Sequence, residues 1–441
     1  MLRNLVPRLA TTAATASRTA AAATARQASS TPADSDPVIV STARTAVGTF
    51  GGSLASLTAP QLGAAAASAA LARAGLSLTP ADEKNPVTQV ASEPFAIDET
   101  YFGNVLQANV GQAPAKQVVI GAGLGVGVPS TTVNKVCASG LKAVMLGAQA
   151  IRLGEANFVL AGGMESMSQA PFYLPDSRWG SRYGHSKALD GIARDGLSDA
   201  YDGSMMGVCA EACATEHGIS RAAQDEYATL SYQRAREAAA AGLFDQEIAP
   251  VTVKSRRGES VVDEDEEPAG MALDKLSSLR TVFKKDGTVT AGNASKINDG
   301  ASALVIASYG AAKAAGLTPI ARILGMGDAS MEPIKFTDAP TPAIERACAR
   351  AGVAVSDIDY FEINEAFAVV ALCNARLLGI DVESQLNVNG GAVALGHPIG
   401  SSGSRILVTL ASILQQRDAS LGVAAICNGG GGASAVVIER M

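Results

Sequence analysis

The sequence predicts an α/β protein built from two similar halves. Strand-like and helix-like segments alternate along the chain, which is typical of layered α/β folds. The composition is 47% apolar but only 4% aromatic, with 45 glycines, and this favours close packing of helices against strands. The layout of residues 137–163 also returns at residues 400–430. At 441 residues the chain exceeds one ordinary core, so two or three domains are expected.

The elements of the first half can be placed in order from apolar runs and glycines. Residues 38–41, Val-Ile-Val-Ser, predict a strand, and the alanine-rich residues 60–75 predict a helix that a glycine ends. Residues 101–105 predict a second strand, and residues 158–161 predict another that ends at two glycines. Residues 85–94, which lie between the predicted helix and the strand at 101–105, predict a surface insertion.

The second half repeats this layout. Residues 137–142 precede a helical pattern, as residues 400–405 do, and residues 159–163 parallel residues 424–430. Two such halves suggest a duplication with an active site between them.

The middle of the chain, residues 167–296, fits neither half and predicts an inserted loop domain. Its acidic run at 263–267 is expected to be solvated surface. The predicted division is then a first half at 37–166 completed by 297–318, the loop domain at 167–296, and a second half at 319–441.

The first 36 residues differ from the rest. They carry Arg3, Arg8, Arg18 and Arg26 among many Ala, Ser and Thr, with no acid before Asp34. This composition predicts a mitochondrial transit peptide and a location in the matrix. The alternative is a disordered N-terminal tail that carries no targeting signal.

Other function classes are disfavoured by the bulk properties. No run of about 18 apolar residues predicts a membrane-spanning helix. A net charge of −7 argues against nucleic acid as the main partner, although a local site for an anionic ligand stays open.

The six cysteines do not indicate a disulfide framework or a zinc site, because none forms a Cys-x-x-Cys pair and the expected compartment is reducing. Cys209 and Cys213 are one helical turn apart, and Cys348 and Cys373 lie in helical patterns. All four are predicted to be small apolar helix positions.

Cys137 differs because a β-prone run ends there and a helix follows. A thiol at such a corner faces the positive end of the helix, which would lower its pKa and favour the thiolate. His397 lies in Gly-His-Pro, and Cys427 precedes a glycine run. Two cysteines and a histidine in such settings suggest acyl transfer through an enzyme thioester.

Four motifs then stand in order along the chain, at 136–140 (Val-Cys-Ala-Ser-Gly), 364–368 (Asn-Glu-Ala-Phe-Ala), 390–400 (which includes Gly-His-Pro) and 427–431 (Cys-Asn-Gly-Gly-Gly). Together they resemble the thiolase family, and within it the acetyl-CoA C-acetyltransferases of mitochondrial type, from about residue 37 onward. The resemblance implies duplicated α/β halves in five layers, αβαβα, with an inserted loop domain.

The resemblance also implies a role for each motif residue. Cys137 would take the acetyl group, and His397 would activate it and form an oxyanion hole with a water held by Asn364. Cys427 would exchange the α-proton of the second acetyl-CoA, and backbone N–H groups of Cys137 and Gly429 would form the second hole. The implied reaction is reversible condensation of two acetyl-CoA into acetoacetyl-CoA and CoA.

Coenzyme A is therefore expected as substrate and product, with no organic prosthetic group. The implied substrate contacts are Tyr232, Gly270, Met271, Ala272, Lys275, Ser295, Met206 and Phe367. Met206 would shorten the acyl pocket, and Met205 stands where many relatives have histidine. For Lys275 the alternative is an ordinary surface lysine.

Some members of the family are activated by potassium. The matching positions are Tyr232, Ala291, Gly292, Ala294 and Val393, which would offer mainly carbonyl oxygens, hard ligands that suit such a cation. A homotetramer is also implied.

Three other functions are open alternatives. A broad-chain 3-ketoacyl-CoA thiolase uses the same catalytic residues, but Met206 and the central loop argue against it. A β-ketoacyl synthase pairs its cysteine with two histidines or with histidine and asparagine, and Cys427 argues against that. A non-enzymatic subunit would be expected to lack Cys137, His397 or Cys427.

Overall fold

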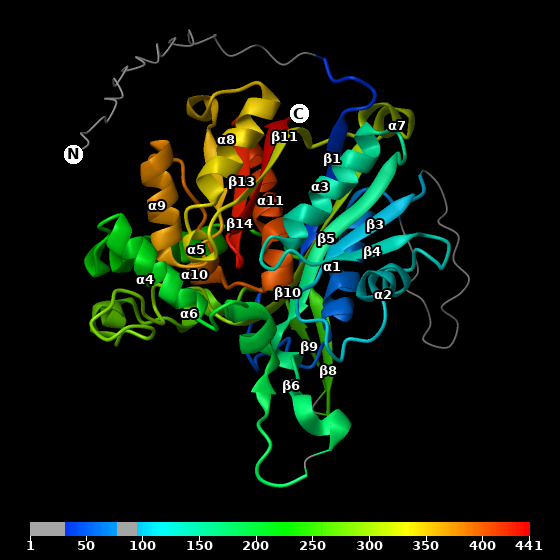
Figure 1. Cartoon of the computed structure of the whole chain (residues 1–441). Coiled ribbons are helices and arrows are strands. Elements are labelled where there is room, and N and C mark those ends of the chain that lie inside the picture. Colours follow the sequence, from blue (N-terminus) through cyan, green and yellow to red (C-terminus); the bar gives the residue numbers. More distant parts are fainter. Residues whose placement is uncertain (1–30, 77–94, 181, 257) are drawn as a thin grey trace, which may run out of the picture. The chain divides into compact units, whose positions relative to one another are not determined.

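The computed structural model describes residues 31–76, 95–180, 182–256 and 258–441. Residues Pro32–Met441 form one compact unit, shown in Figure 1. Most of the predicted leader and the predicted 85–94 insertion lie outside the described residues.

The first half is a five-stranded sheet with helices on both faces. Its strands, in spatial order, are β1 (Pro37–Arg44), β10 (Asn298–Ser308), β5 (Phe158–Ser166), β3 (Glu99–Gly103) and β4 (Ser130–Val133), and β2 (Gly48–Thr49) pairs with β10. Its helices are α1 (Ala59–Arg73), α2 (Pro114–Gly121), α3 (Ser139–Arg152) and the short α7 (Tyr309–Ala314).

The second half has the same plan. Its strands, in spatial order, are β11 (Ala321–Ser330), β14 (Gly432–Arg440), β13 (Leu421–Asn428) and β12 (Tyr360–Ile363). Its helices are α8 (Pro340–Ala351), α9 (Ala368–Leu378), α10 (Ala392–Leu395) and α11 (Ile399–Gln416). The two sheets meet where β1 pairs with β11 through Val38–Arg322 and Ile39–Ala321, so the ten strands are continuous.

Three apolar cores separate the layers. One lies between α1 and the outer face of the first sheet, and another lies between α8, α9 and the outer face of the second. The third holds α3 and α11 between the two sheets (Figure 1). The order is helix, sheet, helices, sheet, helix, which confirms the predicted duplicated α/β arrangement.

Residues 167–296 add further helices and short hairpins. They comprise β6 (Phe172–Tyr173), β7 (Leu189–Asp190), α4 (Met206–Glu216), α5 (Arg221–Ala240), β8 (Val251–Ser255), β9 (Gly258–Val262) and α6 (Glu267–Gly270). No helix in the described part of the chain is long and apolar enough to cross a bilayer.

Several boundaries differ from the sequence predictions, and two of them bear on the site. β5 continues through Gly162 and Gly163 to Ser166 instead of ending at the glycines. Glycine stands inside the strand because α11 packs directly on it: a methyl group added at Gly163 would lie 2.1 Å from the carbonyl oxygen of Gly400. β4 ends at Val133, before Cys137, and a tight turn fills the gap.

The acidic run is only partly solvated surface, and the prediction was wrong for three of its five members. Asp265 binds the fully buried guanidinium of Arg44, with Nη1 and Oδ1 2.8 Å apart. Glu266 accepts from the backbone of Thr49, and Glu267 pairs with Lys296 at 2.6 Å. Asp265 and Glu266 therefore join the middle segment to the first half, while Glu267 pairs within the segment, because a buried charge needs a partner.

Candidate active site

Cys137 lies in a strained turn that leads into α3. Val136, just before it, has φ +48, a region that β-branched residues rarely adopt. The hydroxyl of Ser139 closes the turn, since it accepts from the N–H of Lys135 at 2.8 Å and donates to the carbonyl of Val136 at 2.5 Å. The side chain of Asn134 accepts from the N–H of Val136 at 3.0 Å. These contacts fix where the thiol points.

The predicted thiolate at Cys137 is not the resting form. Burial raises the pKa of Cys137 to about 12, against the opposing effect of the N–H groups of Gly429 and of Cys137 itself. Removal of the thiol from water thus outweighs the position before α3. A base must take the proton before the sulfur can attack.

His397 has the properties of that base. Burial, aided by the charge of Arg405, lowers the pKa of His397 to about 3, so the imidazole is neutral at physiological pH. Its backbone N–H donates to Oδ1 of Asn298 at 2.9 Å. Ile399, two residues on, packs in the same apolar cluster as Val136 and Cys137.

Asn364 faces this histidine from the loop after β12. Its Nδ2 lies 3.4 Å from Nε2 of His397, and its Oδ1 is buried without a hydrogen-bond partner among the described residues. The neighbouring Glu365 holds the loop, because it accepts from Tyr227, and from the N–H of Val393 at 3.0 Å. An amide held this way can bind a water or an oxyanion.

Cys427 is the penultimate residue of β13, and Gly429 lies in the turn that leads to β14. Burial, and next the nearby Cys137, raise the pKa of Cys427 well above its usual range. The N–H of Gly429 reaches the Cys137 sulfur. Residues from both halves therefore meet at this point.

Met206 and Phe367 form an apolar wall beside Cys427. A methyl group added at Gly429 would lie 3.4 Å from Sδ of Met206. Met205, in contrast, points elsewhere: its sulfur accepts from the hydroxyl of Ser198 at 3.3 Å.

The predicted coenzyme A residues gather around α5 and the 364–368 loop. Tyr232 lies on α5 and packs near Met271, while Gly270, Ala272 and Lys275 are exposed. Arg236 of α5 donates to the carbonyls of Pro268 and Met271 and so holds their segment. Ser295 donates to the carbonyl of Ala366 at 2.9 Å, beside Phe367.

Of the predicted potassium ligands, Tyr232 and Val393 lie in one buried cluster, since α5 packs on α10. The Tyr232 hydroxyl is buried without a hydrogen-bond partner in the described part of the chain, which fits a cation ligand. The Lys296 ammonium lies 5.4 Å from the ring centroid and also interacts with the hydroxyl, where it partly offsets the burial that raises the pKa of Tyr232 and competes with a cation. Ala294 is buried and pairs with Phe367, whereas Ala291 is exposed and Gly292 packs on Leu276.

A cleft of about 600 Å³ opens next to Gly430, one residue from Gly429. Cys209 and Met331 line it, together with Asp199 and Tyr201. None of the predicted coenzyme A residues lines this cleft.

Sequence reasoning missed three groups that hold the site together. Glu165, at the end of β5, accepts from Asn104 and from the N–H groups of Val105 and Gly400. Burial raises its pKa to about 7. Ser402 and Asn298 each bind His397. Only the short separation in sequence between His397 and Ser402, at the start of α11, could have signalled their contact.

Comparison with known proteins gives concordant matches. The thiolase N-terminal domain model matches residues 37–310, and the thiolase C-terminal domain model matches residues 317–440. Acetyl-CoA acetyltransferase of Schizosaccharomyces pombe is 54% identical, covering 91% of this chain and 98% of its own length. Acetyl-CoA acetyltransferase ERG10, cytosolic, of Gibberella zeae is 51% identical over the same shares. The Acat5 thiolase of Ascaris suum, solved with coenzyme A, is 42% identical with a TM-score of 0.83, covering 92% of this chain and all of that one.

Proposed function

The chain belongs to the thiolase family, and from this membership we propose that it works as an acetyl-CoA acetyltransferase. Two molecules of acetyl-CoA give acetoacetyl-CoA and CoA, and the reaction is reversible. The observation that carries the proposal is the meeting of Cys137 with Gly429 and Cys427, beside an Asn364–His397 pair.

Acetyl transfer to the enzyme comes first. His397 takes the Cys137 proton on Nε2, and the sulfur attacks the thioester carbonyl of acetyl-CoA. The N–H groups of Cys137 and Gly429 stabilise the oxyanion, and such donors are typically worth about 10²–10³ in rate each. The bond to the CoA sulfur breaks, and that sulfur leaves with the proton of Cys427. The products are acetyl-Cys137, free CoA, a Cys427 thiolate and a protonated His397.

Carbon–carbon bond formation follows. The Cys427 thiolate takes the α-proton of the second acetyl-CoA, and the resulting enolate oxygen is held by His397 Nε2–H and by a water on Asn364. The enolate carbon attacks the acetyl group, and the Cys137 sulfur leaves and recovers its proton from His397. Cys137, Cys427 and His397 all return to their starting protonation, which balances the cycle.

The wall formed by Met206 and Phe367 favours short acyl chains over the alternative, a broad-chain 3-ketoacyl-CoA thiolase. The deciding experiment compares thiolysis of acetoacetyl-CoA and of a long-chain 3-ketoacyl-CoA. Activity confined to acetoacetyl-CoA is the expected result. Comparable rates on both would make the protein a broad-chain thiolase.

The acetyl intermediate can be tested separately. After brief exposure to acetyl-CoA, peptide mass spectrometry should find one acetyl group on the peptide that contains Cys137. The change Cys137→Ser should remove it and the activity, while Cys348→Ser, a buried cysteine of α8, should retain both. Acetylation confined to another residue would contradict the proposed nucleophile.

Coenzyme A would lie along α5, with Tyr232, Met271 and Lys275 near its nucleotide and Ser295 near its pantetheine chain. We also propose that potassium binds at Tyr232 and the nearby carbonyls, where it would hold α5 against α10. The orphaned Tyr232 hydroxyl supports this site, and equal initial rates in potassium and sodium buffers would contradict it.

Location, assembly and domain division are likewise proposals. The arginine-bearing, acid-poor residues 1–36 support import into mitochondria, although the Gibberella zeae relative is described as cytosolic. The location in the cell of a fluorescent protein fused to residues 1–36 would test this targeting. Light scattering on the purified chain would test the proposed homotetramer. The proposed domains are 37–166 with 297–318, the loop domain 167–296, and 319–441.

A further inference from the structure

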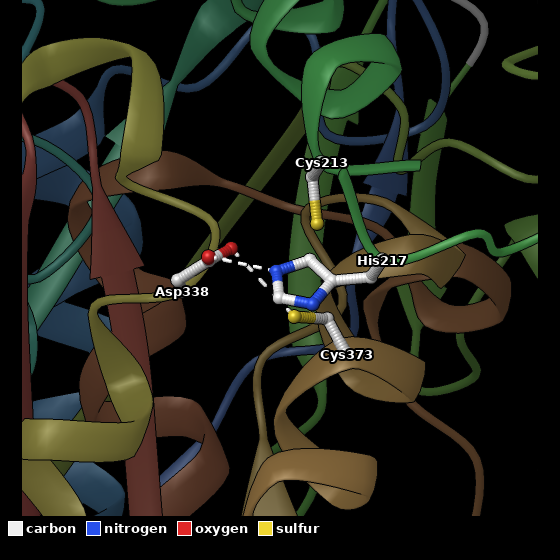
Figure 2. Close-up of side chains that lie close together, drawn as sticks. All are labelled: Cys213, His217, Asp338 and Cys373. Carbon is white, nitrogen blue, oxygen red and sulfur yellow. Dashed lines mark hydrogen bonds and ion pairs between the residues drawn. The ribbon is translucent and has the colours of Figure 1, made fainter. Parts of the chain in front are cut away.

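Four side chains from separate elements converge outside the catalytic centre (Figure 2). Cys213 lies on α4, His217 follows the end of α4, Asp338 precedes α8, and Cys373 lies on α9. One ligand atom from each lies within 4.8 Å of every other. The group therefore joins residues 213–217 of the loop segment to two elements of the second half.

The contacts within this group centre on Asp338. Its Oδ2 lies 2.9 Å from Nε2 of His217, and its Oδ1 accepts from the sulfur of Cys373 at 3.6 Å. Thr337 donates to the same Oδ1 at 3.0 Å, so an outer hydrogen bond already orients the carboxylate. The guanidinium of Arg376 binds the carbonyl of His217 at 2.8 Å and places positive charge nearby.

Burial makes these residues a defined site. The two cysteines are 3% and 0% exposed, so their sulfurs lie in the apolar cluster beside Cys427. The side chains of His217 and Asp338 keep 17% and 11% exposure. An ion could enter from that partly open side.

We propose that Cys213, His217, Asp338 and Cys373 bind one Zn²⁺ ion in a structural site. Two sulfurs, an imidazole and a carboxylate form a complete tetrahedral set for zinc. Zinc–ligand bonds of about 2.0–2.3 Å put tetrahedral ligand atoms about 3.3–3.8 Å apart. The observed limit of 4.8 Å requires closure by about 1 Å. Binding would release the two thiol protons to solvent.

The site would act on the geometry of the acyl wall. α4 begins at Met206 and carries Cys213, and His217 follows its last residue. α9 begins directly after Phe367 and carries Cys373. The same two helices therefore position both the apolar wall and three of the four proposed zinc ligands. Zinc would fasten α4 to α9 and limit movement of Met206. The metal site stands on its own contacts and does not depend on the proposed acetyl transfer.

The test uses the full chain, reduced and freed of metal by a chelator. The double variant Cys137→Ala/Cys427→Ala serves as the background, because the catalytic cysteines could bind metal themselves. After one equivalent of ZnCl₂ and desalting, elemental analysis should find about one zinc per chain. With Co²⁺ in place of zinc, the visible spectrum should show tetrahedral bands and thiolate-to-metal charge transfer.

Variants in the same background locate the ion. Cys373→Ser should weaken zinc binding by more than the about 10–100-fold expected for loss of an outer-shell partner. Cys209→Ser, one turn from Cys213 on the same buried side of α4, should bind as the background does. Asp338→Asn, which keeps the shape of the side chain, covers the case in which Cys373→Ser does not fold.

Several results would overturn the proposal. The proposal fails if the reduced Cys137→Ala/Cys427→Ala protein does not retain zinc, or if its cobalt spectrum shows no charge-transfer band. It also fails if Cys209→Ser weakens zinc binding as much as Cys373→Ser does. Recovery of a Cys213–Cys373 disulfide, together with no zinc uptake after reduction, would identify a redox pair instead. Zinc should also raise the Tm of the background and leave that of Cys373→Ser unchanged.

Discussion

Ser402 lies within hydrogen-bond distance of His397 and favours one tautomer of its imidazole. The Ser402 hydroxyl donates its only hydrogen to the carbonyl of Pro398 at 3.0 Å, and its oxygen lies 2.6 Å from Nδ1 of His397. With that hydrogen on Pro398, the arrangement favours the tautomer in which Nδ1–H donates to the Ser402 oxygen. Nε2 is left with its lone pair and faces Asn364. In that tautomer His397 can take a proton at Nε2, the ring nitrogen nearest the amide proposed to hold the oxyanion-hole water.

Replacement of Ser402 by alanine should slow catalysis by about 10–100-fold, because the lost hydrogen bond supports a charged imidazolium during the reaction. The loss should fall on kcat more than on KM, since Ser402 does not contact substrate. Steady-state thiolysis of acetoacetyl-CoA measures both. Ser412→Ala, on the same helix with its hydroxyl bound to Val408, is the control. An unchanged kcat in Ser402→Ala would show that the tautomer needs no such support.

Alkylation of Cys137 by iodoacetamide should accelerate with pH up to at least about pH 10 without a plateau near neutrality. The reason is that the Cys137 pKa is raised to about 12 while that of His397 is lowered to about 3, so both groups are neutral between these values. Stopped-time labelling followed by peptide mass spectrometry gives the rate. A plateau between pH 5 and 7 would instead indicate a thiolate–imidazolium pair.

Shortening of Met206 to alanine should raise kcat/KM for a medium-chain 3-ketoacyl-CoA relative to acetoacetyl-CoA by about 10-fold or more, because pocket steric terms of this size are usual. Competition assays with both substrates measure the ratio directly. Met205→Ala is a matched control, as that neighbour contacts Ser198 instead of the site. If Met206→Ala and Met205→Ala give the same ratio of the two kcat/KM values, Met206 does not determine the chain length that the enzyme accepts.

Loss of the buried charge at Arg44 should destabilise the fold. Arg44 is 0% exposed and pairs with Glu247 and Asp265, so Arg44→Ala leaves two carboxylates unpaired, at a cost of about 3–5 kcal/mol in the free energy of unfolding. Urea unfolding monitored by circular dichroism provides the value. Lys254→Ala breaks the exposed pair with Glu259 and should change nothing measurable. Similar effects for the two variants would count against a structural role for Arg44.

Short motifs in the sequence point to the groups that we propose to be reactive, but not to the groups that support them. Cys137, Asn364, His397 and Cys427 stand in such motifs, so their chemistry can be inferred from the sequence alone. The raised pKa of Cys137 depends on burial by distant segments, and a short motif does not show which segments will cover it. Glu165 looks like any strand-end acid until α11 brings the N–H of Gly400 to it.

The same limit explains the middle of the chain. Solvent exposure is the natural expectation for the acidic run, because its partners, Arg44 and Lys296, are far away in sequence. Cys213 and Cys373 look like packing residues because 160 positions separate them and only the docking of α4 on α9 brings them together. Long-range pairing of charged or metal-binding groups leaves no periodic signal in either partner.

The position of β14 also sets when the protein can first react. This strand pairs with both β13 and β11, so the hairpin that carries Cys427 and Gly429 forms only after residues 432–440 have been made. During synthesis the first half emerges earlier and can fold earlier. Its Cys137 would then lack the Gly429 N–H, the imidazole and the second thiol. The chemistry that we propose therefore waits until β14 has paired, so folding of the second half switches on a nucleophile that the first half already carries.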